Sequence, residues 1–397
     1  MLRRAMRSLF FLLWTVFWSF LLLELGARVY FSAQLGPDVL LWGTKWHRTQ
    51  QQQRYMRGQN VFEHDNTQIG YSKYHPNQKR TDVAPNGVAF NVTINNKGFR
   101  GADHTIEKPP GTLRVLTLGA SSTFGFGNRD NETYPVLLEE LLNERLDGTV
   151  CGRYSRAEVI NLGIPHLNSA QIAELFLAEG LSYQPDAITL YSGYNNTLGL
   201  GQAASLKVWS RHLLAINFIR VAREQNQRAS QALLDQETEP RSKDFIAGLD
   251  KILATARRHN IKILPMTQQV RAIPAEVIQQ QVISYDREME ILADKLKIQG
   301  DLSLLEGKVL IHGSLSGVLR RWAEDNDLEL IDMIDLLDEH RYLLTSYVHL
   351  APLANQVMAF ALADELITQF ECRLTGKTHG GVEVTETDVI LQLKRTD

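Results

Sequence analysis

The stretch Arg114-Val-Leu-Thr-Leu-Gly-Ala-Ser-Ser-Thr-Phe-Gly-Phe-Gly127 decides the fold of this chain. Val115–Leu118 is an apolar run that is long enough for a buried strand and too short for a helix. It ends at Gly119, and small residues follow it before a helical pattern at Tyr134–Leu146. Strand, tight turn and helix are how an open α/β sheet presents a reactive group, here Ser121, at the carboxyl end of a strand.

This stretch has two other possible interpretations. An ordinary turn would use glycine and serine only for backbone geometry. A nucleotide-binding loop is disfavoured, because neither G-x-G-x-x-G nor a phosphate-binding lysine is present. A serine nucleophile also needs a base and an oxyanion hole, which the rest of the chain has to supply.

Composition narrows the function classes. The chain has 397 residues and a formal net charge of -3, and no basic block alternates with aromatic residues. Nucleic acid is therefore not an expected partner. Two cysteines, Cys151 and Cys372, are too few for a disulfide scaffold or a cysteine zinc site, and neither a metal nor a cofactor is expected.

The N-terminus has the pattern of a membrane signal anchor. Residues 8–31 form 24 mostly apolar positions, enough for a span of roughly 20 residues. No A-x-A-like cleavage site follows, which disfavours a cleaved signal peptide. Arg3, Arg4 and Arg7 place residues 1–7 in the cytoplasm by the positive-inside rule. The rest of the chain is expected outside the cytoplasm, in the periplasm if the source is bacterial.

Beyond the anchor, residues 32–100 are expected to be a lead segment and residues 101–372 a single α/β domain. Its predicted strands are Val115–Leu118, Glu158–Leu162, Ala187–Tyr191, Ile261–Met266 and Leu328–Asp332. Helical patterns alternate with these strands, at Tyr134–Leu146, Ser169–Leu181, Phe245–Arg257, Glu276–Gln299, Ser316–Asn326 and Pro352–Phe370. This alternation predicts a parallel sheet with helices on both faces. Residues 203–243 are a predicted insertion and residues 373–397 a C-terminal tail.

Four short patterns fall at predicted strand ends or helix starts. They are Gly119-Ala-Ser121, Asn161-Leu-Gly163, Gly193-Tyr-Asn195-Asn196 and Ser346-Tyr-Val-His349. In order and context they resemble the SGNH/GDSL hydrolase family. The lead-in Asn95-Asn-Lys-Gly-Phe-Arg-Gly101 is similar to that of its membrane-anchored bacterial members.

The resemblance implies a flavodoxin-like sheet of five parallel strands in the order 2-1-3-4-5. It implies that Ser121 is the nucleophile and His349 the base. The N–H groups of Ser121 and Gly163, with the Asn195 side chain, would form the oxyanion hole. Ser122, His166 and Asn196 are further candidates for the pocket.

The sequence departs from the family pattern at two positions. Ala120 replaces the Asp of the first block, which is not part of the triad. Ser346 stands where the triad Asp is expected, and loss of that carboxylate can cost a serine protease about 10⁴ in rate. Asp332 and Asp335 are candidates to orient His349 instead, as are Ser346 Oγ or a backbone carbonyl. Without a carboxylate, the activity is expected to rise with a midpoint near the reference imidazole pKa of about 6.5.

These residues predict a membrane-anchored, extracytoplasmic serine esterase that forms an acyl-serine. Its substrate would be an ester-bearing small molecule, an O-acetylated glycan or a lipid-like ester. The alternatives are an O-acyltransferase acting on an extracytoplasmic glycan, and an inactive binding protein with the same fold. The segment Lys207–Lys243 is expected to form either a cap beside the site or a solvated helical hairpin.

The predicted topology also pairs the two cysteines. Cys151 follows the first helix and Cys372 the last, and in the strand order 2-1-3-4-5 with right-handed crossovers both helices lie on one face of the sheet. Both thiols should then emerge at the end remote from Ser121. Outside the cytoplasm they are expected to form a disulfide.

Overall fold

The computed structural model describes residues 2–37, 39–41, 43, 62–63, 71, 73–83, 87–147, 149–200, 213–216, 218–219 and 227–374. These residues fall into two compact units, one of Met1–Val61 with Gly199–Arg228 and one of Phe62–Leu198 with Ala229–Asp397. Most of the predicted C-terminal tail and much of the predicted insertion lie outside the described residues. The second unit includes the second half of the predicted lead segment.

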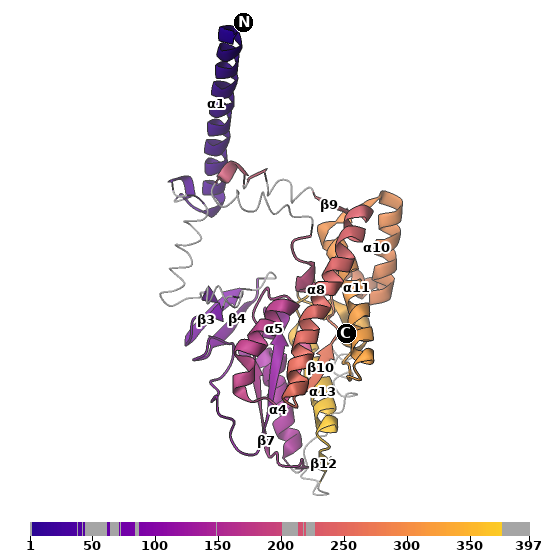
Figure 1. Ribbon diagram of the computed structural model, residues 1–397. Coiled ribbons are helices and arrows are strands. Elements are labelled where there is room, and N and C mark those ends of the chain that lie inside the picture. The colour runs from indigo at the N-terminus through magenta and orange to yellow at the C-terminus, as the bar shows by residue number, and fades with distance from the viewer. Residues whose placement is uncertain are drawn as a thin grey trace. The chain divides into compact units, whose positions relative to one another are not determined.

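Four parallel strands form the central sheet of the second unit (Figure 1). They are β5 (Thr112–Gly119), β7 (Arg156–Asn161), β8 (Ala187–Tyr191) and β10 (Lys262–Met266). Their spatial order is β7-β5-β8-β10, the order 2-1-3-4 that the sequence predicts. All eight residues of β5 are buried, because helices cover both faces of this strand.

The predicted fifth strand is reduced to one parallel bridge between Met266 and Ile331. The N–H of Ile331 donates to the carbonyl of Pro265, and the N–H of Thr267 donates to the carbonyl of Ile331. The next bond of a parallel ladder would need an N–H on Pro265, which proline lacks. The order 2-1-3-4-5 is thus kept, but the prediction of a full strand at Leu328–Asp332 is wrong.

Short strand pairs surround the sheet. The pairs are β1 (Phe62–Glu63) with β2 (Lys73–Tyr74), β3 (Gln78–Val83) with β4 (Ala89–Ile94), β6 (Thr149–Val150) with β12 (Arg373–Leu374), and β9 (Arg228–Ser230) with β11 (Asp301–Ser303).

Some helices of this unit have close to the bounds that the apolar spacing predicts, whereas the predicted stretch Glu276–Gln299 is divided into two helices and the helix predicted at Ser316 begins at Leu304. The helices are α3 (Ser121–Phe124), α4 (Tyr134–Leu146), α5 (Ser169–Ala178), α8 (Gln231–Arg258), α9 (Ala275–Gln281), α10 (Tyr285–Gln299), α11 (Leu304–Asp325), α12 (Met333–Leu336) and α13 (Pro352–Gln369). Single 3-10 turns are η1 (Asp130–Glu132), η2 (Gly180–Tyr183), η3 (Tyr194–Thr197) and η4 (Asp338–Leu343).

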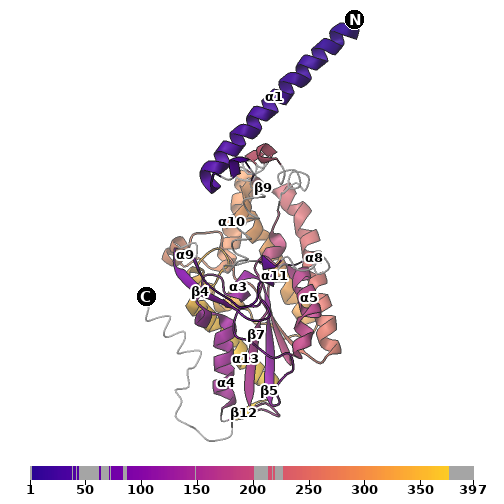
Figure 2. The same ribbon diagram turned by 90° about the vertical axis from the view of Figure 1, so that its left-hand side faces the viewer.

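One face of the sheet packs on α4 and α13, and α5 packs against α8 (Figures 1 and 2). Leu113 and Val115 of β5 point into the cluster made with α4 and α13. The alternate residues Leu116 and Leu118 are equally buried and must face the other side of the sheet. The central strand is therefore fixed from both sides, which sets the position of the residues that follow it.

Helix α8 begins inside the predicted insertion 203–243, well before the helix that was predicted at Phe245–Arg257. It starts at Ser230, whose side chain accepts the N–H of Leu233, and continues through Pro240. Ion pairs one turn apart, Glu237 with Arg241 and Glu239 with Lys243, line the polar part. Such pairs support a helix that lacks an apolar stripe, so apolar spacing did not reveal it.

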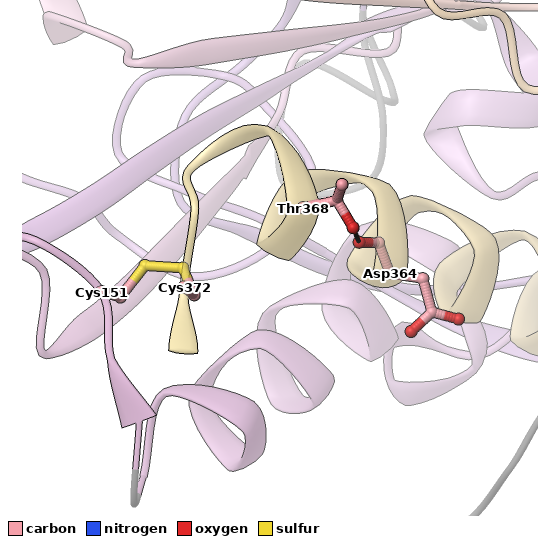
Figure 3. The surroundings of a disulfide bond; sticks show 4 residues. All are labelled: Cys151, Asp364, Thr368 and Cys372. Carbon is pink, nitrogen blue, oxygen red and sulfur yellow. Dashed lines mark hydrogen bonds between the residues drawn. A yellow bond between two sulfur atoms is a disulfide. The ribbon is translucent and has the colours of Figure 1, made fainter. Parts of the chain in front are cut away.

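The predicted disulfide is present (Figure 3). Cys151 and Cys372 are bonded, with their Cα atoms 4.1 Å apart and 221 positions between them in sequence. Cys372 comes shortly after the end of α13, and the strands β6 and β12 pair beside the bond. This outcome confirms the topology from which the pairing was predicted.

The first unit is built around α1 (Leu2–Leu35). Within its segment Met6–Gln34, an 18-residue window has a mean hydropathy of 1.9 and is 0% buried. Among the described residues this is the one helix long and apolar enough to cross a membrane.

Candidate active site

The central strand β5 ends in a turn that only glycine can form. A Cβ atom on Gly119 would lie 2.0 Å from Thr123 Oγ1 and 2.6 Å from the carbonyl oxygen of Tyr191. Helix α3 starts immediately after this turn, and Ser121 is its first residue. The tight turn therefore carries the Ser121 hydroxyl to the carboxyl end of the sheet.

A loop from far along the chain brings an imidazole to this hydroxyl. His349 Nε2 lies 2.8 Å from Ser121 Oγ, although the two residues are 228 positions apart. The loop is closed by the N–H of Thr345, which donates to the carbonyl of His349, and by the bridge between Leu344 and Leu350. Neutral Nε2 is thus placed to take the hydroxyl proton.

The other imidazole nitrogen faces a serine. Ser346 Oγ lies 2.9 Å from His349 Nδ1 and also accepts the backbone N–H groups of Val348 and His349 at 3.3 and 3.2 Å. When Nε2 acts as the base, the ring proton is on Nδ1, and this N–H donates a hydrogen bond to Ser346 Oγ. A hydroxyl that can donate as well as accept selects this tautomer less strongly than a carboxylate does.

Asp332 and Asp335, the two candidates to orient His349, lie beside other groups. Asp332 forms an ion pair with Arg320 at 2.7 Å and accepts the Thr267 hydroxyl at 2.6 Å, which holds the pKa of its carboxyl below the usual value despite burial. The Asp335 side chain is 79% exposed and lies 3.8 Å from Arg320. Within the described part of the chain, the partner recorded at His349 Nδ1 is Ser346 and not a carboxylate.

Burial controls the protonation of the imidazole. It lowers the pKa of His349 to about 4, with a smaller lowering from the nearby His166. The Phe126 ring contributes to the burial, with its centroid 4.8 Å from that of the imidazole. Burial therefore favours an acid midpoint of activity below the expected value near 6.5, because sequence alone does not show how far this side chain is removed from water.

The three proposed oxyanion donors lie on three successive loops after the strands. The first N–H groups of a helix have no acceptor within it, which leaves the Ser121 N–H at the start of α3 available. The Gly163 N–H donates to Asn161 Oδ1 at 2.9 Å, and Asn195 Nδ2 uses one hydrogen on the carbonyl of Leu167. The second hydrogen of that amide leaves Asn195 a donor to spare.

Gly163 also has a packing role. A Cβ atom there would lie 2.3 Å from the backbone nitrogen of Phe124 and 2.7 Å from the carbonyl carbon of Thr123. The loop after β7 can therefore approach α3 only with glycine at this position. The side chain of Asn161 reinforces the contact, donating to the carbonyl of Thr123 at 3.0 Å.

Two of the three further pocket candidates form hydrogen bonds within the protein. Buried Ser122 donates its hydroxyl to the carbonyl of Val348 at 2.9 Å and so links α3 to the histidine loop. Buried Asn196 accepts the N–H of Ser169 and donates to its hydroxyl. His166 is exposed and Tyr347 is 39% exposed, with its ring 6.3 Å from that of His349.

Sequence reasoning missed the importance of Arg100. Its guanidinium donates to the carbonyls of Phe124 and Gly125, at 3.0 and 2.7 Å, at the end of helix α3. It also donates to the carbonyls of Asn91 and Asn128 and pairs with Asp130. The Arg100 side chain is 2% exposed. The signal was its place in the lead-in Asn95–Gly101, which by itself reads as a turn.

No cluster that could hold a metal is found in the described ranges, where three or more His, Cys, Asp or Glu side chains nowhere converge.

Residues 117–357 match the model of the GDSL-like lipase/acylhydrolase family. No curated protein is significantly similar to this chain in sequence.

Similar solved structures include the acetyl xylan esterase AlAXEase, with 18% identity, a TM-score of 0.40, and 64% of this chain and 100% of that chain covered. They also include the carbohydrate acetylesterase Est24 from Sinorhizobium meliloti, with 11% identity, a TM-score of 0.39, and coverage of 64% and 99%. The aryl esterase from M. smegmatis has 14% identity, a TM-score of 0.39, and coverage of 64% and 98%.

Proposed function

Because the chain belongs to the GDSL-like lipase/acylhydrolase family, we propose that Ser121 and His349 hydrolyse an ester through an acyl-serine intermediate. The observation that carries this proposal is the 2.8 Å contact between His349 Nε2 and Ser121 Oγ. Nucleophile and base within hydrogen-bond distance, on two distant segments, are the recognisable signature of an activated serine.

The proposed reaction has two steps. Ser121 Oγ attacks the ester carbonyl carbon while its proton passes to His349 Nε2. The bond from that carbon to the alcohol oxygen then breaks, and the alcohol leaves with the proton. Water attacks the acyl-serine in the same way and gives a proton to Nε2, and the acid is released as the carbon–Oγ bond breaks and that proton passes from Nε2 to Ser121 Oγ.

Negative charge on the carbonyl oxygen has to be stabilised in both steps. We propose the Ser121 N–H and the free Asn195 amide hydrogen as the main donors, with the Gly163 N–H shared between Asn161 and the oxyanion. Each such donor is worth about 10²–10³ in kcat when removed. The proposed substrate is an ester of a short acid on an extracytoplasmic glycan or lipid.

We further propose that α1 is a membrane anchor with its N-terminus in the cytoplasm. The apolar stretch of α1 is unburied, and Arg3, Arg4 and Arg7 precede it. The Cys151–Cys372 disulfide fits an oxidising compartment for the catalytic unit.

A hydrolysis assay on the full chain in detergent tests the catalytic proposal. We expect turnover of p-nitrophenyl acetate to fall at least about 10³-fold in Ser121→Ala and in His349→Ala. Ser182→Ala and His259→Ala, which change exposed residues away from the site residues in sequence, serve as matched controls and should retain activity. Equal activity in Ser121→Ala and wild type would overturn the proposal, and no activity in any form would favour a binding protein.

A further inference from the structure

The apolar helix α1 carries one charge pair. Glu24 and Arg28 are the charged residues within 8–31, and Arg28 Nε lies 3.1 Å from Glu24 Oε1. Ionisable side chains in a membrane helix are costly and therefore call for a partner. In this structure each member of the pair also binds a separate short segment of the chain.

Glu24 holds the start of a helical segment from the insertion. Its carboxylate accepts the N–H of Ala215 at 2.8 Å and that of Leu214 at 3.2 Å, where helical residues 214–216 begin. Arg28 Nη1 donates to the carbonyls of Leu40 and Leu41, in helical residues 39–41, at 3.0 and 3.2 Å. An acid at free N–H groups and a base at free carbonyls satisfy both segments.

Apolar side chains complete the docking. Ala27 and Phe31 of α1 form a buried cluster with Val39, Leu214 and Ala215. We call helical residues 39–41, 214–216 and 218–219 the collar. Both segments lie beside the C-terminal part of α1 (Figures 1 and 2).

The outer surface of the collar is also apolar. Leu41 is 72% exposed and Ile219 46%, and Leu40 and Phe218 are exposed as well. The Phe218 ring packs edge-on against that of Tyr30, 5.2 Å away, which continues this surface onto α1. Side chains of this kind flank charged groups where helices lie in the interfacial layer of a membrane.

We propose that the collar is embedded in the outer interfacial layer of the bilayer that α1 spans, with Leu41, Phe218 and Ile219 against lipid. The inference rests on the proposed anchoring of α1. We propose lipid as the occupant because the apolar surface of the collar is continuous with the unburied apolar surface of α1. Residues 214–216 and 218–219 of the insertion are then a second point of membrane attachment.

The docking also implies that α1 stays in the mature protein. Removal of α1 would leave the N–H groups of Leu214 and Ala215 without their acceptor and would expose the apolar cluster. If α1 were cleaved off, the complementarity between α1 and a segment about 190 positions away in sequence would stabilise nothing.

Depth-dependent fluorescence quenching on the full chain tests the collar. Both native cysteines are in a disulfide, so Ile219→Cys supplies a unique thiol for an environment-sensitive dye. Phe20→Cys in α1 and exposed Glu140→Cys in α4 are the reference positions. In phosphatidylcholine–phosphatidylglycerol vesicles with a shallow nitroxide lipid, we expect blue-shifted, quenched emission at 219, blue-shifted emission at 20, and water-like emission at 140.

Water-like, unquenched emission at 219 with membrane-like emission at 20 would overturn the collar and leave the anchor standing. Water-like emission at both positions would overturn the anchor itself. Blue-shifted emission at 219 that nitroxide lipid does not quench would place a second copy there instead of lipid, and would also refute the proposal.

A docking variant tests the role of the charge pair. Glu24→Leu keeps α1 apolar but removes the acceptor of two N–H groups. We expect quenching at 219 to fall at least twofold while emission at 20 stays unchanged, with hydrolysis confirming that the catalytic unit is folded. Unchanged quenching at 219 would show that Glu24 does not hold the collar.

Discussion

Ser346 is the residue that sets this site apart from an aspartate-containing triad, because its hydroxyl takes the place of a carboxylate beside His349 Nδ1. We predict that Ser346→Asp raises kcat by about 10- to 10³-fold, since a carboxylate fixes the productive tautomer and stabilises the imidazolium. The variant should also raise the pKa of His349, seen as a higher acid midpoint of kcat/KM. Ser346→Ala, the matched control, should be slower than wild type. A variant Ser346→Asp with wild-type rate and midpoint would refute this role.

The lowered pKa of His349 makes a second prediction. The imidazole must be neutral to accept the Ser121 proton, so the hydrolysis rate should be constant from about pH 5.5 to 8. It should fall below that range with a midpoint near 4. Rates measured at constant ionic strength across this range check it. A midpoint near 6.5 would mean that the imidazole is more solvated than the structure shows.

The same burial affects folding. Burial lowers the pKa of His349 to about 4 and that of His312 to about 3, whereas unfolded histidine titrates near 6.5. Between these values the unfolded chain binds protons that the folded chain does not, so stability should fall as the pH drops from 6.5 towards 4. Urea unfolding midpoints at pH 7.5 and 5 should show this decrease.

At the scale of elements, the hairpin of β3 and β4 supports helix α3, which carries Ser121. Phe90, Val92 and Ile94 of β4 pack with Phe124 of α3, and Arg100 ties the following loop to the carbonyls that end that helix. The segment expected to be a polar lead therefore contributes directly to the position of Ser121.

Replacement of Arg100 tests this support. Arg100→Lys keeps the charge but cannot reach four carbonyls and a carboxylate at once, so we predict a kcat at least about 10-fold lower with little change in KM. The conservative Arg129→Lys, at a side chain that is 63% exposed, is the control and should behave as wild type. The rate of fluorophosphonate inactivation should fall in parallel with kcat. A change confined to thermal stability would show that Arg100 only stabilises the fold.

The bounds of a helix or strand could be predicted from the sequence where burial of apolar residues alone determines them. Helix α4 and strand β8 have the predicted bounds, because burial imposes their apolar spacing. The sequence predicts only the second half of helix α8, from Phe245, since ion pairs rather than apolar residues support its first half. The fifth strand stops at a single bridge because Pro265, across the sheet, lacks the N–H for the next bond, and no local pattern at residues 328–332 carries that information.

The sequence predicts which residues form the candidate site, but it predicts less about the surroundings of their side chains. The motif positions lead to Ser121 and His349, which the fold brings together. The depressed pKa of His349 and the bonds of Arg100 arise from side chains that approach through tertiary packing, which one sequence does not display.

At the scale of the whole molecule, the disulfide closes the sheet domain at the end where α4 and α13 finish. A loop of 221 residues gives about 5 kcal/mol of stabilisation on the chain-entropy model. We predict that the double variant Cys151→Ser, Cys372→Ser melts about 5–15 °C lower than wild type, by calorimetry in the same detergent. Hydrolysis at 20 °C should be little changed, because the bond lies remote from Ser121. Equal melting temperatures with and without a reductant would contradict the prediction.

The most direct test of the central claim is covalent labelling of the full chain with a fluorophosphonate, followed by peptide mass spectrometry. An activated serine displaces the fluoride and retains the phosphonyl group, so one adduct should appear on Ser121. Its rate should fall below pH 5 with the protonation of His349, and labelling should be lost in Ser121→Ala and greatly slowed in His349→Ala. An unlabelled protein at every pH from 4 to 9, or an adduct on another residue that persists in Ser121→Ala, would contradict the assignment of Ser121 as the nucleophile.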